Sequence, residues 1–207
     1  MKHLVQRQLS QSISTLEAVL ADERIISTIV AIGEVTANAL RSGHKLLVAG
    51  NGGSAADAQH LVSEFVVRLT VNRPALRAIA LTTDTSILTA ASNDFGYGTV
   101  FSRQIEALGQ PGDVFLGIST SGNSPNILKA LHQAKEQAIT TIGFTGTGGG
   151  QMLPLCDHNI VIPSCVTMNI QESHLALEHI FCMVVERFLF GMDFDKTPQP
   201  QSEQLCR

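Results

Sequence analysis

The feature that most constrains the fold is a regular alternation between short apolar runs and longer segments with helical spacing. The apolar runs predict five β-strands, at residues 44–49, 77–82, 113–118, 140–144 and 158–162. Helical segments lie between and after them, near residues 54–69, 84–92, 97–108, 124–137 and 170–189. Continuous apolar strands joined by helices are typical of a parallel sheet covered on both faces. We therefore predict an α/β fold, a three-layer α/β/α sandwich around a parallel five-stranded sheet.

The segment before the first strand is helical as well. Residues 4–41 carry apolar positions at helical spacing, with a break near Asp22 and Glu23, which predicts two N-terminal helices. A chain of 207 residues is long enough for one well-buried domain, and no linker or internal repeat divides it. We predict a single domain over residues 1–190 and a disordered tail over 191–207, where two prolines stand among polar residues.

Composition excludes several classes of protein. The net charge of −4 and the absence of a Lys/Arg run argue against a nucleic-acid footprint. No stretch reaches the ~18 apolar residues of a membrane span. The four cysteines lack metal-site spacing, which favours reduced thiols in a cytoplasmic protein. A hydrophobic content of 44% with 15% charged residues also suggests oligomerisation.

Two predicted strands are followed by unusual loops. The first strand leads through residues 50–53 into a helix for which Ser54 is the predicted N-cap, and the third leads through residues 119–124 into a helix that starts near Pro125. Helix N-termini attract anions, and glycines let an anion approach the backbone. The same residue types also form ordinary turns, but two such loops at matching strand ends favour a phosphate site. The glycine-rich run at 145–150 is expected to be a flexible turn.

A possible reactive pair lies on the helix after the first loop. His60 and Glu64 are four residues apart, so their side chains lie on one helix face. By itself, His60 would more often be a packed residue than a ligand. The nearby glutamate and the two loops favour a functional role for it.

Together these motifs resemble the SIS (sugar isomerase) domain family, and within it the phosphoheptose isomerases. The residues that carry the resemblance are Gly50-Asn51-Gly52-Gly53-Ser54, His60, Glu64, Ser119-Thr120-Ser121-Gly122-Asn123-Ser124, Gln171-Glu172 and His179. The similarity extends to about residue 190. It implies a flavodoxin-like SIS fold and the conversion of sedoheptulose 7-phosphate into D-glycero-D-manno-heptose 7-phosphate, for bacterial heptose and lipopolysaccharide precursors. It also implies a homotetramer with sites at subunit interfaces and one Zn²⁺ per subunit.

The resemblance also implies roles for single residues. The catalytic residues would be Glu64 and His179. The substrate-binding residues would be Asn51, Gly52, Gly53, Ser54, Glu64, Asn93, Asp94, Ser119, Thr120, Ser121, Ser124 and Gln171. The metal ligands would be His60, Glu64, Gln171 and His179. We hypothesise that Glu64 moves the carbon-bound proton through a cis-enediol while His179 exchanges protons with the oxygens.

Some assignments conflict with one another. A carboxylate bound to zinc is a weaker base, so Glu64 cannot act fully in both roles. Gln171 and His179 would lie about 12 Å apart along an ideal helix and roughly 80° around it. Some relatives carry an acidic residue where this chain has Met168, which puts the ring-opening group in doubt. Arg68 is either a phosphate contact or a solvated charge, and His174 is a further ligand candidate that the resemblance does not select.

Two other functions remain open. One is a non-catalytic tetrameric scaffold of the SIS fold, like the relatives that associate with the initiator DnaA. Those relatives tend to lack the acidic residue at the position of Glu64, which this chain retains. The other is a sugar-phosphate sensor. Such sensors usually carry a basic helix-turn-helix domain, and the N-terminal helices here lack the charge for one.

Overall fold

Five parallel strands form one sheet at the centre of the molecule. The computed structural model describes residues 1–191, and within them the strand order is β2-β1-β3-β4-β5. The strands are β1 (Leu46–Ala49), β2 (Ala78–Ala80), β3 (Val114–Ser119), β4 (Thr140–Thr145) and β5 (His158–Val161). Each overlaps a strand that the sequence predicts, so the five-stranded parallel sheet is confirmed. The order is that of a flavodoxin-like sheet, in which strand order reverses between β1 and β3.

Helices precede the sheet and cover both of its faces. The helices are α1 (Lys2–Ala21), α2 (Glu23–Arg41), α3 (Gly53–Val66), α4 (Thr85–Phe95), η1 (Tyr97–Thr99), α5 (Ser102–Leu108), α6 (Pro125–Glu136), η2 (Gly150–Leu155) and α7 (Thr167–Phe190), of which η1 and η2 are 3-10 helices. The predicted break between the first two is confirmed. Asp22 ends α1 and caps α2, because its side chain accepts a hydrogen bond from the backbone N–H of Arg24.

Two predictions about helix bounds are wrong in detail. The segment 97–108 is not one helix, because the buried residues Val100 and Phe101 form a turn between η1 and α5 that places both side chains in the core. The N-cap of α3 is not Ser54 but Gly52, whose φ of +56° favours glycine. Ser54 instead lies buried in the first turn of α3.

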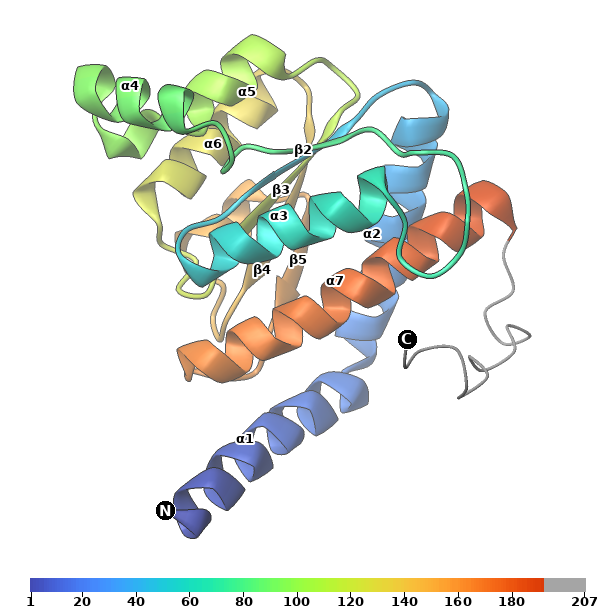
Figure 1. Ribbon diagram of the computed structural model, residues 1–207, viewed down its shortest axis with the longest axis vertical. Coiled ribbons are helices and arrows are strands. Elements are labelled where there is room, and N and C mark those ends of the chain that lie inside the picture. The colour runs from blue at the N-terminus through green and yellow to red at the C-terminus, as the bar shows by residue number, and fades with distance from the viewer. Residues whose placement is uncertain (192–207) are drawn as a thin grey trace, which may run out of the picture.

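The core has two halves, one on each face of the sheet. Val48 belongs to the half that α2, α3 and α7 cover, together with Phe65 and Phe181. Its neighbour Leu47 points to the other half, which α4, α5 and α6 cover and to which Ile105 belongs. Figure 1 shows α3 and α7 together on one side of the strands, and α4, α5 and α6 gathered on the other.

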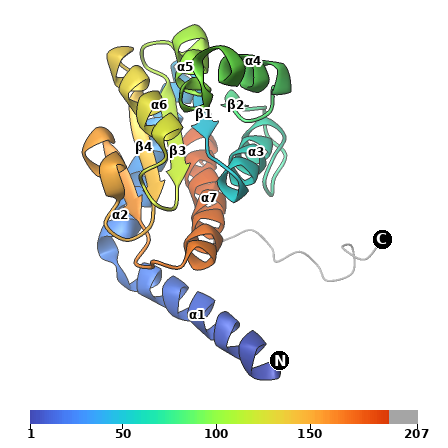
Figure 2. The same cartoon turned by 90° about the vertical axis from the view of Figure 1, so that its left-hand side faces the viewer.

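Helix α1 differs from the rest because it extends away from the body of the molecule in both views (Figures 1 and 2). Its buried residues are Thr15 and Val19. Apolar side chains along the same helix are exposed, including Leu9, Ile13 and Leu20 at 59%, 55% and 72%. This helix therefore carries an apolar surface that the single chain leaves uncovered.

The predicted tail lies, except for Gly191, outside the described residues. Within residues 1–191, none of the helices combines the length and the apolar character that crossing a lipid bilayer requires.

Candidate active site

The loops that follow β1 and β3 meet at one edge of the sheet. The two strands are neighbours in register, so their carboxyl ends lie side by side. The side chains of Asn51 and Asn126 exchange two hydrogen bonds across these loops, of 2.9 and 2.8 Å. The hydroxyl of Tyr97 donates to the side-chain oxygen of Asn51 at 2.9 Å. The sequence predicted Asn51 in the sugar site. It missed the buried Asn126 and it missed Tyr97, because these two residues belong to no motif.

The loop after β3 gathers hydroxyl groups, and we call residues 119–124 the serine loop. The Oγ of Ser119 lies 2.9 Å from that of Ser124 and 3.4 Å from that of Ser121. Ser124 is the N-cap of α6 but its side chain makes no capping bond. Pro125 has no N–H and the N–H of Ile127 bonds the Ser124 carbonyl, so the N–H left without an acceptor in the first turn of α6 is that of Asn126, and the helix end is electropositive. The serine loop can thus receive an anionic group such as a phosphate.

The glycine-rich run at residues 145–150 packs against the serine loop. Gly122 has a φ of +64°, and a Cβ at this position would meet the carbonyl of Gly149. The N–H of Met152 donates to the carbonyl of Gly122 at 3.0 Å, and the N–H of Gly146 donates to that of Thr120 at 3.0 Å. Residues 145–150 do turn, as the sequence predicts, but they also pack against the loop they hold in place.

The second part of the site lies between α3 and α7. The two helices run in the same direction side by side, as Figure 1 shows. Three contacts follow one another along them: Asp57 with Gln171, His60 with His179, and Phe65 with Phe181. Residues more than a hundred positions apart in the sequence are thereby brought together.

The two histidines and Glu64 converge, as the sequence predicts for a reactive centre. The Nε2 atoms of His60 and His179 lie 2.7 Å apart, with their rings nearly perpendicular. A carboxylate oxygen of Glu64 lies 3.7 Å from the Nε2 of His60. The side chain of Glu64 is 16% exposed and that of His60 is 40% exposed. A carboxylate base and imidazole acids are thus available at one place, which is the requirement for proton transfer.

Gln171 lies on the same helix pair but faces a different residue. Its side-chain nitrogen donates to both carboxylate oxygens of Asp57, at 3.2 and 3.0 Å. Burial raises the pKa of Asp57, against the lowering effect of that hydrogen bond. The role of Gly53 follows from the same contact, since a Cβ there would meet the amide of Gln171. In this structure Gln171 is therefore held by Asp57, a residue that sequence reasoning missed.

A second acid that the sequence did not single out is Glu178. It is fully buried, and neither of its carboxylate oxygens has a hydrogen-bond partner. Burial, and next the charge of Asp57, raise the pKa of Glu178 to about 8. Its position seven residues after Gln171 puts it on the same helix face, but that spacing is also typical of core residues, so the sequence offered no usable signal.

The remaining candidates lie apart from this centre. Asn93 and Asp94 are exposed at the end of α4, where the amide of Asn93 donates to Asp94 at 2.8 Å. Arg68 is exposed just beyond the end of α3. His174 faces the sheet, because its Nε2 bonds the carbonyl of Thr145 at 3.1 Å in a buried setting. It therefore does not join the two site histidines.

The site is shallow in the single chain. A hollow of about 230 Å³ lies beside Thr120 and Ser121, and another of about 200 Å³ lies beside Asp57 and Gln171. Ligand sites are usually larger than about 300 Å³. A larger cavity, of about 640 Å³, lies between α2 and β5 and is lined by none of the predicted site residues. Within residues 1–191, no three His, Cys, Asp or Glu side chains are arranged closely enough to hold a metal ion.

Comparison with known proteins identifies the family. Residues 9–146 match the model of the SIS domain. The chain is 51% identical over 187 residues to a phosphoheptose isomerase of Burkholderia pseudomallei, covering 90% of this chain and 95% of that one. It is 50% identical over 194 residues to a phosphoheptose isomerase of Aneurinibacillus thermoaerophilus, covering 94% and 98%.

Solved structures agree with the sequence matches. A phosphoheptose isomerase from Neisseria gonorrhoeae superposes with a TM-score of 0.84 at 38% identity, covering 89% of this chain and 98% of that one. One from Francisella tularensis has the same TM-score at 33% identity, covering 89% and 97%. The chain therefore belongs to the SIS domain family, and within it to the phosphoheptose isomerases, which are phosphosugar isomerases.

Proposed function

We propose that this protein converts sedoheptulose 7-phosphate into D-glycero-D-manno-heptose 7-phosphate, an early step toward the heptose of bacterial surface polysaccharide. The observation that carries the proposal is the combination of an anion-binding loop with a His/Glu pair in a chain of this family. An aldose–ketose isomerisation needs both features. One holds the phosphate, and the other moves protons near the carbonyl.

The proton transfers can be assigned to two residues. Moving the carbonyl from C2 to C1 requires a base to take the proton from C1 and return it to C2 through a cis-enediol. Glu64 suits this role because its carboxylate is mostly buried beside His60. As the enediol forms the C2 oxygen gains a proton, and as it collapses the C1 oxygen loses one. His179, which lies beside His60, would exchange both protons.

Substrate binding is divided between the two loops. The hydroxyls of the serine loop and the N–H of Asn126 at the start of α6 would hold the phosphate, with Thr120 beside them and Ser54 in the first turn of α3. Asn51 would line the sugar site, with Gly52, Gly53, Asn93, Asp94 and Gln171. The Asn126 side chain occupies one donor and one acceptor of Asn51, so Asn51 keeps one N–H for a sugar hydroxyl.

Zinc is part of the proposal, and the donor types fit it. Imidazole nitrogen and carboxylate oxygen are common zinc ligands, so His60, His179 and Glu64 would hold the ion, with the amide oxygen of Gln171, whose nitrogen bonds Asp57, as a fourth donor. Because residues 1–191 hold no group of side chains already arranged around a metal, the fit rests on the chemistry of these donors and not on their positions. A bound zinc would polarise the sugar carbonyl as a Lewis acid.

We also propose a cytoplasmic homotetramer with its sites at subunit interfaces. The exposed apolar side chains of α1 and the shallowness of the site both support a second chain beside it. Free cysteines at 156, 165 and 182 agree with a reducing compartment. Mixing Glu64→Gln chains with Ser119→Ala chains tests whether sites are shared, at a sugar concentration so far below the raised KM of Ser119→Ala that each variant alone shows little turnover. Recovered activity supports shared sites, and no recovery contradicts them.

The deciding experiment is turnover of sedoheptulose 7-phosphate by the purified protein with a zinc assay on the same sample. Formation of the aldose, with zinc bound near one ion per chain, is the expected result. A folded, zinc-loaded protein that does not convert the sugar would contradict the proposal and favour the non-catalytic scaffold.

A further inference from the structure

We propose that Arg73 is a positioning residue, which keeps Glu64 and His179 in register by joining the end of α3 to α7. This inference rests on the proposed isomerase function. Arg73 lies in the segment between α3 and β2, yet its side chain is only 1% exposed. Its Nε donates to a carboxylate oxygen of Glu186 on α7 at 2.6 Å, and the Glu186 side chain is fully buried. A buried ion pair between a loop and a helix is costly unless further hydrogen bonds satisfy it.

The Nη1 and Nη2 groups of Arg73 bond the last turn of α3, and Nη1 also donates to the carbonyl of the adjacent Pro74 at 3.1 Å. Its Nη2 donates to the carbonyl of Glu64 at 2.6 Å, and its Nη1 donates to the carbonyl of Phe65 at 2.7 Å. Because α3 ends at Val66, these carbonyls are among the four that a helix end leaves without helical partners. A cation at that end also complements the helix dipole. The guanidinium therefore fixes the turn from which the side chain of Glu64 projects.

The same guanidinium fixes this turn relative to His179. Glu186 follows His179 by seven residues, two helical turns, on one face of α7. The donors of an arginine lie in a rigid planar fork, so one group sets both the rotation of α3 and its distance from α7. At the other end of the contact, Gln171 and Asp57 hold the same two helices together. Misplacing a catalytic group by about 1 Å can reduce the rate by ~100-fold.

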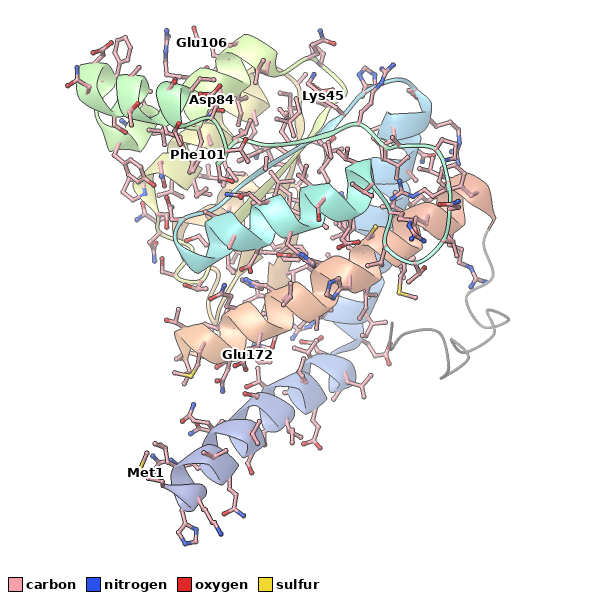
Figure 3. All side chains as sticks on the ribbon, viewed as in Figure 1. Met1, Lys45, Asp84, Phe101, Glu106 and Glu172 are labelled. Atoms are coloured by element: carbon pink, nitrogen blue, oxygen red, sulfur yellow. The ribbon has the colours of Figure 1, made fainter. Side chains whose placement is uncertain are left out.

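The test compares two buried ion pairs. Replacing Arg73 alone would leave Glu186 charged and buried, and such a variant is expected to fold poorly, so the double variant Arg73→Met/Glu186→Met removes both charges. The control is Lys45→Met/Asp113→Asn. In that pair the Lys45 Nζ lies 2.6 Å from Asp113, whose side chain is fully buried. Lys45 precedes β1, and Figure 3 shows it near the top of the view, apart from Glu172 on α7.

We expect the Arg73/Glu186 double variant to lose at least about tenfold in kcat for sedoheptulose 7-phosphate. Its KM should stay within about twofold, because the serine loop that holds the phosphate is untouched. The control pair should keep both constants within about twofold at a temperature where each protein is fully folded by circular dichroism. Equal kcat values for the two double variants would overturn the inference.

A second readout does not depend on turnover. The backbone N–H of Val67 bonds the carbonyl of Ser63 in the last turn of α3. Hydrogen exchange of the amides at 63–67 should be at least about tenfold faster in the Arg73/Glu186 variant than in the control. Equal exchange rates would overturn the inference. If the wild type fails to convert the sugar, the proposed function fails, and these exchange rates alone decide whether Arg73 orders this turn.

Discussion

The serine loop and the α3–α7 helix pair form the two halves of the site in different ways. The serine loop is six consecutive residues whose shape comes from backbone hydrogen bonds and from glycines packed behind it. The helix pair brings together His60 and His179, which are 119 positions apart, and depends on Arg73 at its far end. The loop is therefore suited to binding and the pair to chemistry. Changes in the first should raise KM, whereas changes in the second should lower kcat.

The largest effect is expected for Glu64→Gln. The amide keeps the shape of the side chain but cannot take a proton from carbon, so kcat should fall by about 10³-fold with little change in KM. Steady-state kinetics with sedoheptulose 7-phosphate measures both constants. Glu136→Gln, an exposed glutamate at the end of α6, is the matched control. Near-normal turnover by Glu64→Gln would remove the distinction between the two halves of the site.

A smaller effect of the opposite kind is expected for Ser119→Ala. The hydroxyl of Ser119 contacts those of Ser121 and Ser124, so its loss removes one phosphate contact and loosens two others. A hydrogen bond to a charged group contributes about 1.5–3 kcal/mol. KM should therefore rise by about 10- to 100-fold, with kcat within about threefold.

Ser27→Ala on the exposed face of α2 serves as the control for this substitution. A fall in kcat at unchanged KM would mean that the serine loop acts in the chemical step. The loop would then no longer be a binding element alone.

The contrast between the two halves also explains what could be predicted from the sequence. The sheet was predictable because buried parallel strands are continuous apolar runs, and the serine loop was predictable because its residues are adjacent. The roles of Asp57 and Arg73 could not be predicted, because they come from contacts across the helix pair. Asp57 contacts Gln171, and Arg73 contacts Glu186. His179 entered the prediction only through family resemblance, since no local pattern distinguishes it from a packed histidine.

The residue that joins the two loops gives the next prediction. Asn126 is buried and exchanges two hydrogen bonds with Asn51. In Asn126→Ala the Asn51 side chain loses its orientation toward the sugar, so KM should rise by about tenfold. The exposed Asn38→Ala is the control. An unchanged KM would indicate that Asn51 does not contact the substrate.

The smallest effect on catalysis, within about twofold in kcat, is expected at His174. It lies on the same helix as His179, but its ring faces Phe144 and the Thr145 carbonyl of β4. Burial lowers the pKa of His174 to about 4, against the opposing effect of its hydrogen bond to Thr145. The folded state therefore keeps the ring neutral over a range in which the unfolded chain, with a histidine pKa near 6.5, takes up a proton.

Because the unfolded state binds more protons, this histidine makes the protein less stable as the pH falls from about 6.5 to 4, by about 1.4 kcal/mol per pH unit. His174→Phe removes that contribution. As the pH falls from 7 to 4.5, the melting temperature of the variant minus that of the wild type should therefore increase by several degrees. Glu178, whose raised pKa of about 8 acts in the opposite direction, is present in both proteins and cancels in the difference. An acid profile that the substitution leaves unchanged would mean that the ring is charged in the fold, and His174 would then return to the candidates for the site beside His179.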